Sequence, residues 1–290
     1  MKKLFALLCF FSCLVYGQEE IDQPQSNIQT YTPSKMLSQG QWDIKWFNNL
    51  YTEVKGRNDQ GNKTEFPRQN FFTSSLDVFT GVSSDNRFNV GVLLEYRSNT
   101  ILGKNILAPF GFSAQKYRRN GLSSIAPAIK FAPIKNWARF AVQTSFSIPL
   151  FENETEDGIF LDQKGYTFQN RFFYDYLAPN GLVQIYSELN TELNFGENTD
   201  SFANDSFRLT PGVFFSYFPT PNTTLLGLVQ YSQLFDLGGS INQGYTAAGA
   251  GAKLQLNQVH NLEVIYTNFI AGKNSGMGQT FNLGLRALFN

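Results

Sequence analysis

The chain ends in the stretch QTFNLGLRALFN, residues 279–290, and this stretch decides the fold. Every second residue from Phe281 to Phe289 is apolar, while the residues between them are mostly polar or small. Successive side chains of a β-strand point to opposite faces, so this period of two predicts a strand with one apolar and one mostly polar face. Such a strand either closes a β-barrel or forms the edge of a β-sandwich.

The same alternation recurs upstream and predicts twelve strands of roughly ten to fourteen residues. They cover residues 41–53, 70–82, 87–98, 122–132, 139–150, 165–177, 182–195, 206–218, 223–235, 244–256, 261–270 and 279–290. Connections after odd-numbered strands are expected to be long (8 to 22 residues), and those after even-numbered strands about four residues. This alternation is the plan of a transmembrane barrel. The predicted fold is all-β: a 12-stranded antiparallel up-and-down transmembrane β-barrel over residues 41–290, with short periplasmic turns and longer outer loops.

The first residues read as an export signal. Two lysines precede a short apolar run, which ends in Val15-Tyr16-Gly17 with small residues at the outer positions. This pattern predicts a signal peptide over residues 1–17, cleaved before Gln18. Both cysteines, Cys9 and Cys13, lie inside it, so the mature chain is expected to have none. The following residues, 18–40, are polar and are predicted to be a periplasmic lead-in, disordered rather than a partial plug.

The composition narrows the classes of function. The chain has 23 basic and 23 acidic residues, and this balance argues against nucleic-acid binding, which needs a basic surface. No run of 18 apolar residues occurs after the signal, so no transmembrane helix is predicted. A membrane role then requires a closed barrel, because an open sheet leaves unpaired backbone groups in lipid.

The charged residues on the strands fall mostly on the face opposite the aliphatic one. In a barrel this face is the lumen, because a charge facing lipid costs ~2–4 kcal/mol at the bilayer midplane. The predicted lumen residues are Asp43, Lys45, Asp77, Arg87, Glu95, Arg97, Lys130, Arg171, Asp175, Glu188, Glu192, Arg208, Lys253 and Arg286.

Counting outward from the turns predicts three cross-strand ion pairs: Arg171 with Glu188, Glu192 with Arg208, and Arg286 with Asp43 across the seam. Two interpretations of the charged face stay open. The charges either form a salt-bridge lattice that fills a narrow barrel or line a pore that selects solutes. Because both signs are present, a pore of this kind is expected to discriminate little between cations and anions.

No catalytic or metal site is predicted, and neither enzymatic activity nor a cofactor is expected. His260 is the only histidine, and position 262, where barrel phospholipases carry a serine, is Leu262. A single histidine and no mature cysteine exclude the usual zinc clusters. The acidic run 152–157 lacks the ordered spacing of a calcium loop and is predicted to be solvated.

One long connection carries two unusual segments. Lys116, Arg118 and Arg119 form a basic group that is expected to be solvated, with contact to lipopolysaccharide phosphates as the alternative. The apolar segment 106–112 either folds inward as a constriction or extends the strands above the membrane.

From residue 41 to the end, the chain resembles small outer-membrane β-barrels of the porin or putative-transporter kind. In length, signal and strand layout it is similar to the barrels associated with the meta-pathway of phenol degradation. The resemblance implies the outer membrane of a Gram-negative cell, contact with lipid and lipopolysaccharide, and recognition of the C-terminal strand by the barrel-insertion machinery. It also implies a channel or facilitator for small solutes of unknown identity. The alternative is a plugged barrel with a structural or surface-binding role.

Overall fold

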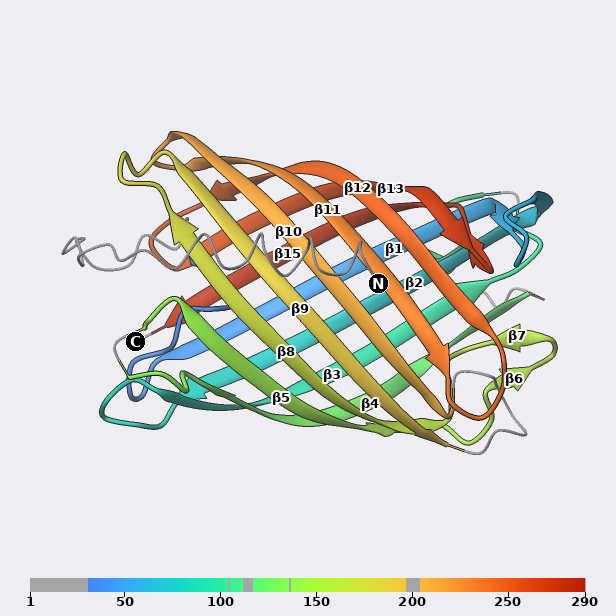
Figure 1. Cartoon of the computed structure of the whole chain (residues 1–290), viewed down its shortest axis with the longest axis horizontal. Coiled ribbons are helices and arrows are strands. Elements are labelled where there is room, and N and C mark those ends of the chain that lie inside the picture. The colour runs from blue at the N-terminus through green and yellow to red at the C-terminus, as the bar shows by residue number, and fades with distance from the viewer. Residues whose placement is uncertain (1–30, 104, 112–116, 136, 197–203, 290) are drawn as a thin grey trace, which may run out of the picture.

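The computed structural model describes residues 31–103, 105–111, 117–135, 137–196 and 204–289. They form a closed barrel of 12 long antiparallel strands (Figure 1), which confirms the predicted fold. The strands are β1 (Trp42–Arg57), β2 (Lys63–Gly81), β3 (Phe88–Thr100), β4 (Arg118–Phe131), β5 (Phe140–Pro149), β8 (Gly165–Leu177), β9 (Val183–Gly196), β10 (Ser206–Thr220), β11 (Thr223–Asp236), β12 (Asn242–Gln255), β13 (His260–Lys273) and β15 (Gln279–Phe289). Among these residues, no helix is long and apolar enough to cross a membrane.

Four short elements lie in the connections: β6 (Thr155–Glu156), β7 (Ile159–Phe160), β14 (Ser275–Gly276) and the single-turn helix η2 (Ala108–Phe110). The barrel closes because β1 pairs with β2 on one side and with β15 on the other. Phe289, at the end of β15, lies opposite Trp42, the first residue of β1. We call the end that carries these two residues the turn end and the opposite end the loop end (Figure 1).

The wall is apolar outside and polar inside. Outward-facing Trp46, Val229 and Ile270 are about half exposed, at 49%, 54% and 56%. Inward-facing Asp43 and Lys130 are only 5% and 4% exposed. A water-soluble barrel has the reverse arrangement, whereas a barrel in lipid needs an apolar band on its outer surface. The alternation of the sequence therefore maps onto the two faces of a membrane-type wall.

The connection lengths differ from the strict alternation expected. The first loop-end connection covers only residues 58–62, whereas the turn-end connection 132–139 is longer than predicted. The reason is that β1 and β2 continue to pair beyond a register shift after Glu53, so residues expected in a loop extend the ladder. The two longest connections, 101–117 and 150–164, both lie at the loop end.

The apolar segment of connection 101–117 takes neither of its predicted positions; within it, residues 106–111 are described. It packs against the outer surface of the wall, on the outward face of β2 and β3. The Asn70 side chain donates a hydrogen bond to the Asn105 carbonyl (3.2 Å), and the Phe72 ring meets the Phe110 ring edge-on at 4.6 Å. The segment thus covers polar groups on the outward face of the wall.

Candidate functional site

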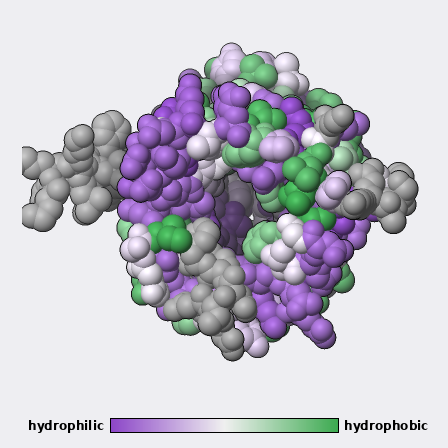
Figure 2. Space-filling model, turned by 90° about the vertical axis from the view of Figure 1, so that its right-hand side faces the viewer, coloured by the Kyte–Doolittle hydropathy of each residue, from purple (hydrophilic) through white to green (hydrophobic). Residues whose placement is uncertain are grey.

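The lumen contains two adjoining cavities, of about 500 and 840 Å³. The first, called the plug-side cavity, is bounded by residues 31–33, and the second, the loop-side cavity, by residues 160–163. Both are lined by Asp77, Arg171 and Tyr245, so they meet at these side chains. Figure 2 looks onto the loop end and shows a hollow at the centre of the mouth, surrounded mainly by hydrophilic residues. The barrel interior is therefore a hollow lined by both polar and apolar side chains that opens toward the loop end.

Residues 31–40 lie inside the barrel at the turn end, and we call them the plug. The Lys35 N–H donates a hydrogen bond to the Thr32 carbonyl (3.1 Å), and this turn places Pro33 at the position where its fixed φ is favoured. The buried Lys130 ammonium donates to the carbonyls of Pro33 (3.0 Å) and Lys35 (2.7 Å). The disorder predicted for residues 18–40 is therefore wrong for the plug, while residues 18–30 lie outside the described part of the chain.

A carboxylate holds the same turn from the other side. Asp175, on β8, accepts hydrogen bonds from the hydroxyls of Thr32 and Ser34. A buried carboxylate needs donors in place of the water it has lost, and these two hydroxyls supply them. Lys130 and Asp175, both predicted lumen residues, thus have the plug as their partner rather than each other or a solute.

The remainder of the plug packs against the wall through apolar contacts. Leu37 is fully buried among Phe79, Ala128 and Leu288, which come from β2, β4 and β15. Burial of a leucine side chain contributes roughly 1.5–3 kcal/mol. The plug is therefore held by a combination of a buried apolar anchor and charge-assisted hydrogen bonds.

The three cross-strand ion pairs predicted from the sequence are present: Arg171–Glu188 (2.8 Å), Arg208–Glu192 (3.5 Å) and Arg286–Asp43 (3.0 Å). A fourth pair joins Lys253 to Glu263 (3.0 Å). Arg286 also lies over the Tyr31 ring, 4.7 Å from its centroid, so the seam pair extends into the plug. Lys45 and Asp77 line the plug-side cavity, and Glu95 and Arg97 line the loop-side cavity.

Arg87 is the exception among the predicted lumen residues. It precedes the first residue of β3, so strand alternation does not fix its direction. Its guanidinium donates two hydrogen bonds to the Ala132 carbonyl, at 3.0 and 2.7 Å. The structure therefore assigns Arg87 to the neighbouring connection at the turn end, not to the lumen wall.

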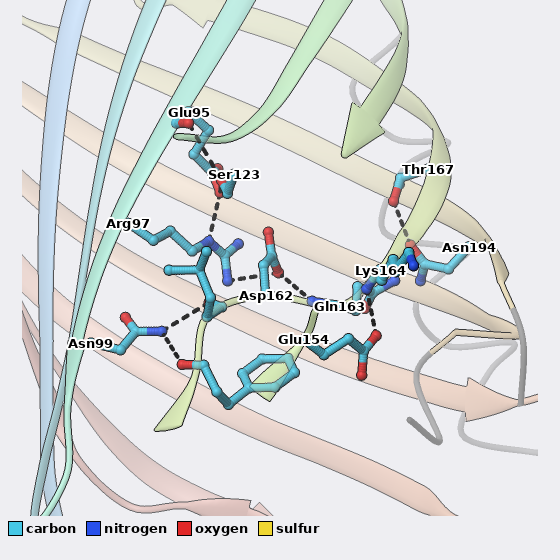
Figure 3. A network of polar contacts seen from close by, with 12 residues as sticks. Glu95, Arg97, Asn99, Ser123, Glu154, Asp162, Gln163, Lys164, Thr167 and Asn194 are labelled. Atoms are coloured by element: carbon cyan, nitrogen blue, oxygen red, sulfur yellow. Dashed lines mark hydrogen bonds and ion pairs between the residues drawn. The ribbon is translucent and has the colours of Figure 1, made fainter. Parts of the chain in front are cut away.

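Connection 150–164 folds inward at the loop end (Figure 3). The Asp162 carboxylate lies 2.9 Å from the Arg97 guanidinium, which also binds Glu95 at 2.6 Å. The Asn99 side chain donates to the Phe160 and Leu161 carbonyls, both at 2.8 Å. Asp162 is not among the lumen residues predicted from the sequence. The apolar run Ile159-Phe160-Leu161 before it is the signal that could have indicated an inward fold.

The basic and acidic runs noted in the sequence meet each other. Arg119 donates to Glu156 at 3.1 Å and to the backbone carbonyls of Asn153 and Glu154. Its side chain is only 9% exposed, so the prediction of a solvated basic group is wrong for Arg119. Arg118 lies in the β3–β4 ladder, and Lys116 lies outside the described residues. Arg119 and its ladder partner Asn99 therefore both hold connection 150–164.

The ionisation of the Asp162 carboxyl makes the docking of connection 150–164 depend on pH. Burial raises the pKa of its carboxyl to about 6, against the attraction of Arg97, and the Glu95 carboxylate adds to the rise. A solvent-exposed Asp has a pKa of about 3.9, so the docked connection binds a proton more tightly than an undocked one. By linkage, the tighter proton binding of Asp162 stabilises the docked connection. This stabilisation is fully present below about pH 4 and is lost as the pH rises through about 6.

We therefore expect connection 150–164 to be more mobile at pH 8 than at pH 5. A nitroxide label on Thr155→Cys, an exposed position in β6, reports this mobility by electron paramagnetic resonance. Asp162→Asn should abolish the pH dependence, because it removes the titrating group. Asp157→Asn, a neutralised acid on the same connection, should retain it. Equal mobility at both pH values in the otherwise unchanged protein contradicts this prediction.

The class defined by these features is a twelve-stranded membrane-type β-barrel with a polar, partly plugged lumen. No family model matches the sequence, and no curated protein matches it either. An outer membrane channel from Pseudomonas putida F1 has a similar fold, with a TM-score of 0.69 and 12% identity over 93% of this chain and 100% of that one. The β domain of the Bordetella autotransporter BrkA is similar with a TM-score of 0.55 and 13% identity, over 86% of this chain and 99% of that domain. At these identities the likeness extends to the fold alone.

Proposed function

We propose that this protein is an outer-membrane channel for small solutes whose lumen is closed at the turn end by its own plug. The observation that carries the proposal is the continuous interior space. Two adjoining cavities of about 500 and 840 Å³ run from the loop-end mouth to the plug. The plug is held by hydrogen bonds and apolar packing, and both kinds of contact are reversible. The fold it shares with an outer membrane channel agrees with this function.

The proposal includes the location. The apolar outer wall suits lipid, and the predicted signal peptide over residues 1–17 supports export to the outer membrane of a Gram-negative cell. In this setting β15 is the segment that the insertion machinery recognises, and lipid and lipopolysaccharide surround the barrel. The turn end faces the periplasm and the loop end faces outward.

The lumen charges predict the ion preference. The four cross-strand ion pairs of the wall each bring one positive and one negative group, so these pairs add no net charge along the pore. We therefore expect weak discrimination between cations and anions. A reversal potential measured across a salt gradient, near zero for potassium chloride, checks this expectation.

Recording from single proteins in a planar lipid bilayer tests the channel itself. We expect small, intermittent conductance steps from the unchanged protein, because the plug occupies the turn end. Recordings are also made with a variant whose plug is loosened by Lys130→Met and Asp175→Ala. If neither protein conducts above the lipid control while both migrate as folded barrels on gels, the channel proposal fails. The second candidate, a plugged barrel with a structural or surface-binding role, then takes its place, since the ion pairs and the plug both favour it.

A further inference from the structure

Lys45 and Asp77 are opposite charges that face each other without being joined. Their Cα atoms are partners in the β1–β2 ladder. Among the described residues, the Lys45 ammonium has the Phe47 ring, 4.7 Å away, as its contact, and it makes no hydrogen bond or ion pair. Asp77 Oδ1 is buried and has no hydrogen-bond partner within the same part of the chain.

Charged side chains without an ion-pair partner are unusual among the described residues that line the plug-side cavity. The neighbouring charges Arg171, Lys253 and Arg286 are each paired at 3.0 Å or less, with Glu188, Glu263 and Asp43. Partly buried charges without partners are costly, so a cavity that leaves one cation and one anion unpaired is arranged for an outside partner. The partner must supply one group of each sign, because a single ion would leave the other charged side chain unpaired.

The opposite wall has a different character. In the closed sheet, β9 and β10 lie directly across from β1 and β2, and β11 lies beside β10, four strands from β1. The same cavity is lined there by Leu226 and Leu228, which pack with Ile265 and Phe214 in one apolar cluster. The volume, about 500 Å³, lies within the range typical of small-molecule sites, ~300–1,000 Å³. The cavity thus has an apolar patch, centred on β11, in addition to its charged side chains.

We propose that the plug-side cavity binds a small zwitterion with an apolar side group, such as an apolar α-amino acid. The ligand carboxylate accepts hydrogen bonds from the Lys45 ammonium, and the ligand ammonium donates to Asp77. The apolar group points across the lumen to Leu226 and Leu228. This inference rests on the proposed channel function and assigns its solute class, but the binding site can be tested without conduction.

Titration calorimetry on the folded full-length mature protein in detergent tests the site. The probe is L-leucine, and two analogues each lack one charge: 4-methylpentanoate lacks the ammonium, and 3-methylbutylamine lacks the carboxylate. We expect leucine to bind about tenfold or more tightly than either analogue, the effect of losing one charge-assisted hydrogen bond in a buried site. Lys45→Met and Asp77→Asn should each weaken leucine binding by a similar factor.

Lys63→Met is the matched control, because this lysine is exposed at the start of β2, outside the lumen. It should bind leucine as the unchanged protein does. Migration on unheated gels verifies that every variant is folded, and Lys45→Arg, which keeps the charge, should restore binding if Lys45→Met loses it. The inference is overturned if the analogues bind as tightly as leucine, or if the folded Lys45→Met and Asp77→Asn variants bind leucine unchanged.

The two proposals fail separately. A protein that conducts ions but does not bind leucine overturns the zwitterion site and leaves the channel in place. A protein that binds leucine but never conducts, even with the plug loosened, overturns the channel and leaves a binding barrel with the same site.

Discussion

Replacing Lys130 by Met and Asp175 by Ala together is expected to raise the open probability of the reconstituted channel about tenfold or more. The two side chains supply four hydrogen bonds to the plug: two from Lys130 to backbone carbonyls and two from plug hydroxyls to Asp175. A hydrogen bond to a charged group contributes about 1.5–3 kcal/mol, and losing about 1.4 kcal/mol already shifts a closed–open equilibrium tenfold. Single-channel recording measures the change directly.

The control for this experiment also removes one acid and one base, but at a site away from the plug. Glu192→Gln with Arg208→Met also deletes one acid and one base, but this pair lines the loop-side cavity and lies outside the plug contacts. Its open probability should stay at the level of the unchanged protein. If the plug variant and this control behave alike, the plug contacts do not govern closure.

Arg171→Ala is expected to lower the free energy of unfolding by about 3 kcal/mol, because it leaves a buried carboxylate without its cation. The Glu188 side chain is 12% exposed and lies 2.8 Å from the guanidinium. Arg171 also lies over the Phe173 ring, 5.1 Å from its centroid, so the truncation removes packing as well. The figure is at the low end for buried pairs because the Arg171 side chain keeps 26% of its surface exposed. Urea unfolding in detergent, followed by gel migration, measures it.

Two further variants separate charge from packing. Arg171→Met with Glu188→Gln should regain most of the loss, since no buried charge remains and the amide oxygen of the new side chain can still accept from the Tyr186 hydroxyl. Arg208→Ala should cost about 1 kcal/mol or less, because its pair is longer and both side chains are about a quarter exposed. An Arg171→Ala loss no larger than that of Arg208→Ala contradicts the prediction.

The sequence predicts those parts of the structure in which neighbouring strands pair residue by residue. Once a turn is located, each step outward fixes one cross-strand neighbour, and this rule places Arg208 directly opposite Glu192. The pairs Arg171–Glu188 and Arg286–Asp43 are diagonal: the ladder partners of the two arginines are Asn190 and Lys45, and each side chain reaches an acid two positions away on the neighbouring strand. Period-two alternation and barrel closure leave little freedom in the register of strand pairing, because shifting a strand by one residue turns every apolar side chain toward the lumen.

The parts that the sequence does not predict depend on segments without a period. The plug has no alternation, and its order arises from Lys130 and Asp175, which lie far along the chain. Asp162 lies in a connection whose inward direction is set by Arg97 and Asn99 on another strand. In each case the decisive contact is long-range, and only the closed barrel brings its partners together.

The contact of Arg286 with Tyr31 has a consequence for biogenesis. One side chain belongs to the last strand, pairs with the first strand through Asp43, and stacks on the plug. One side chain therefore links the ladder that completes the cylinder to the segment inside it. Closure of the wall and placement of the plug share this side chain, so we expect the two to be coupled when the barrel assembles.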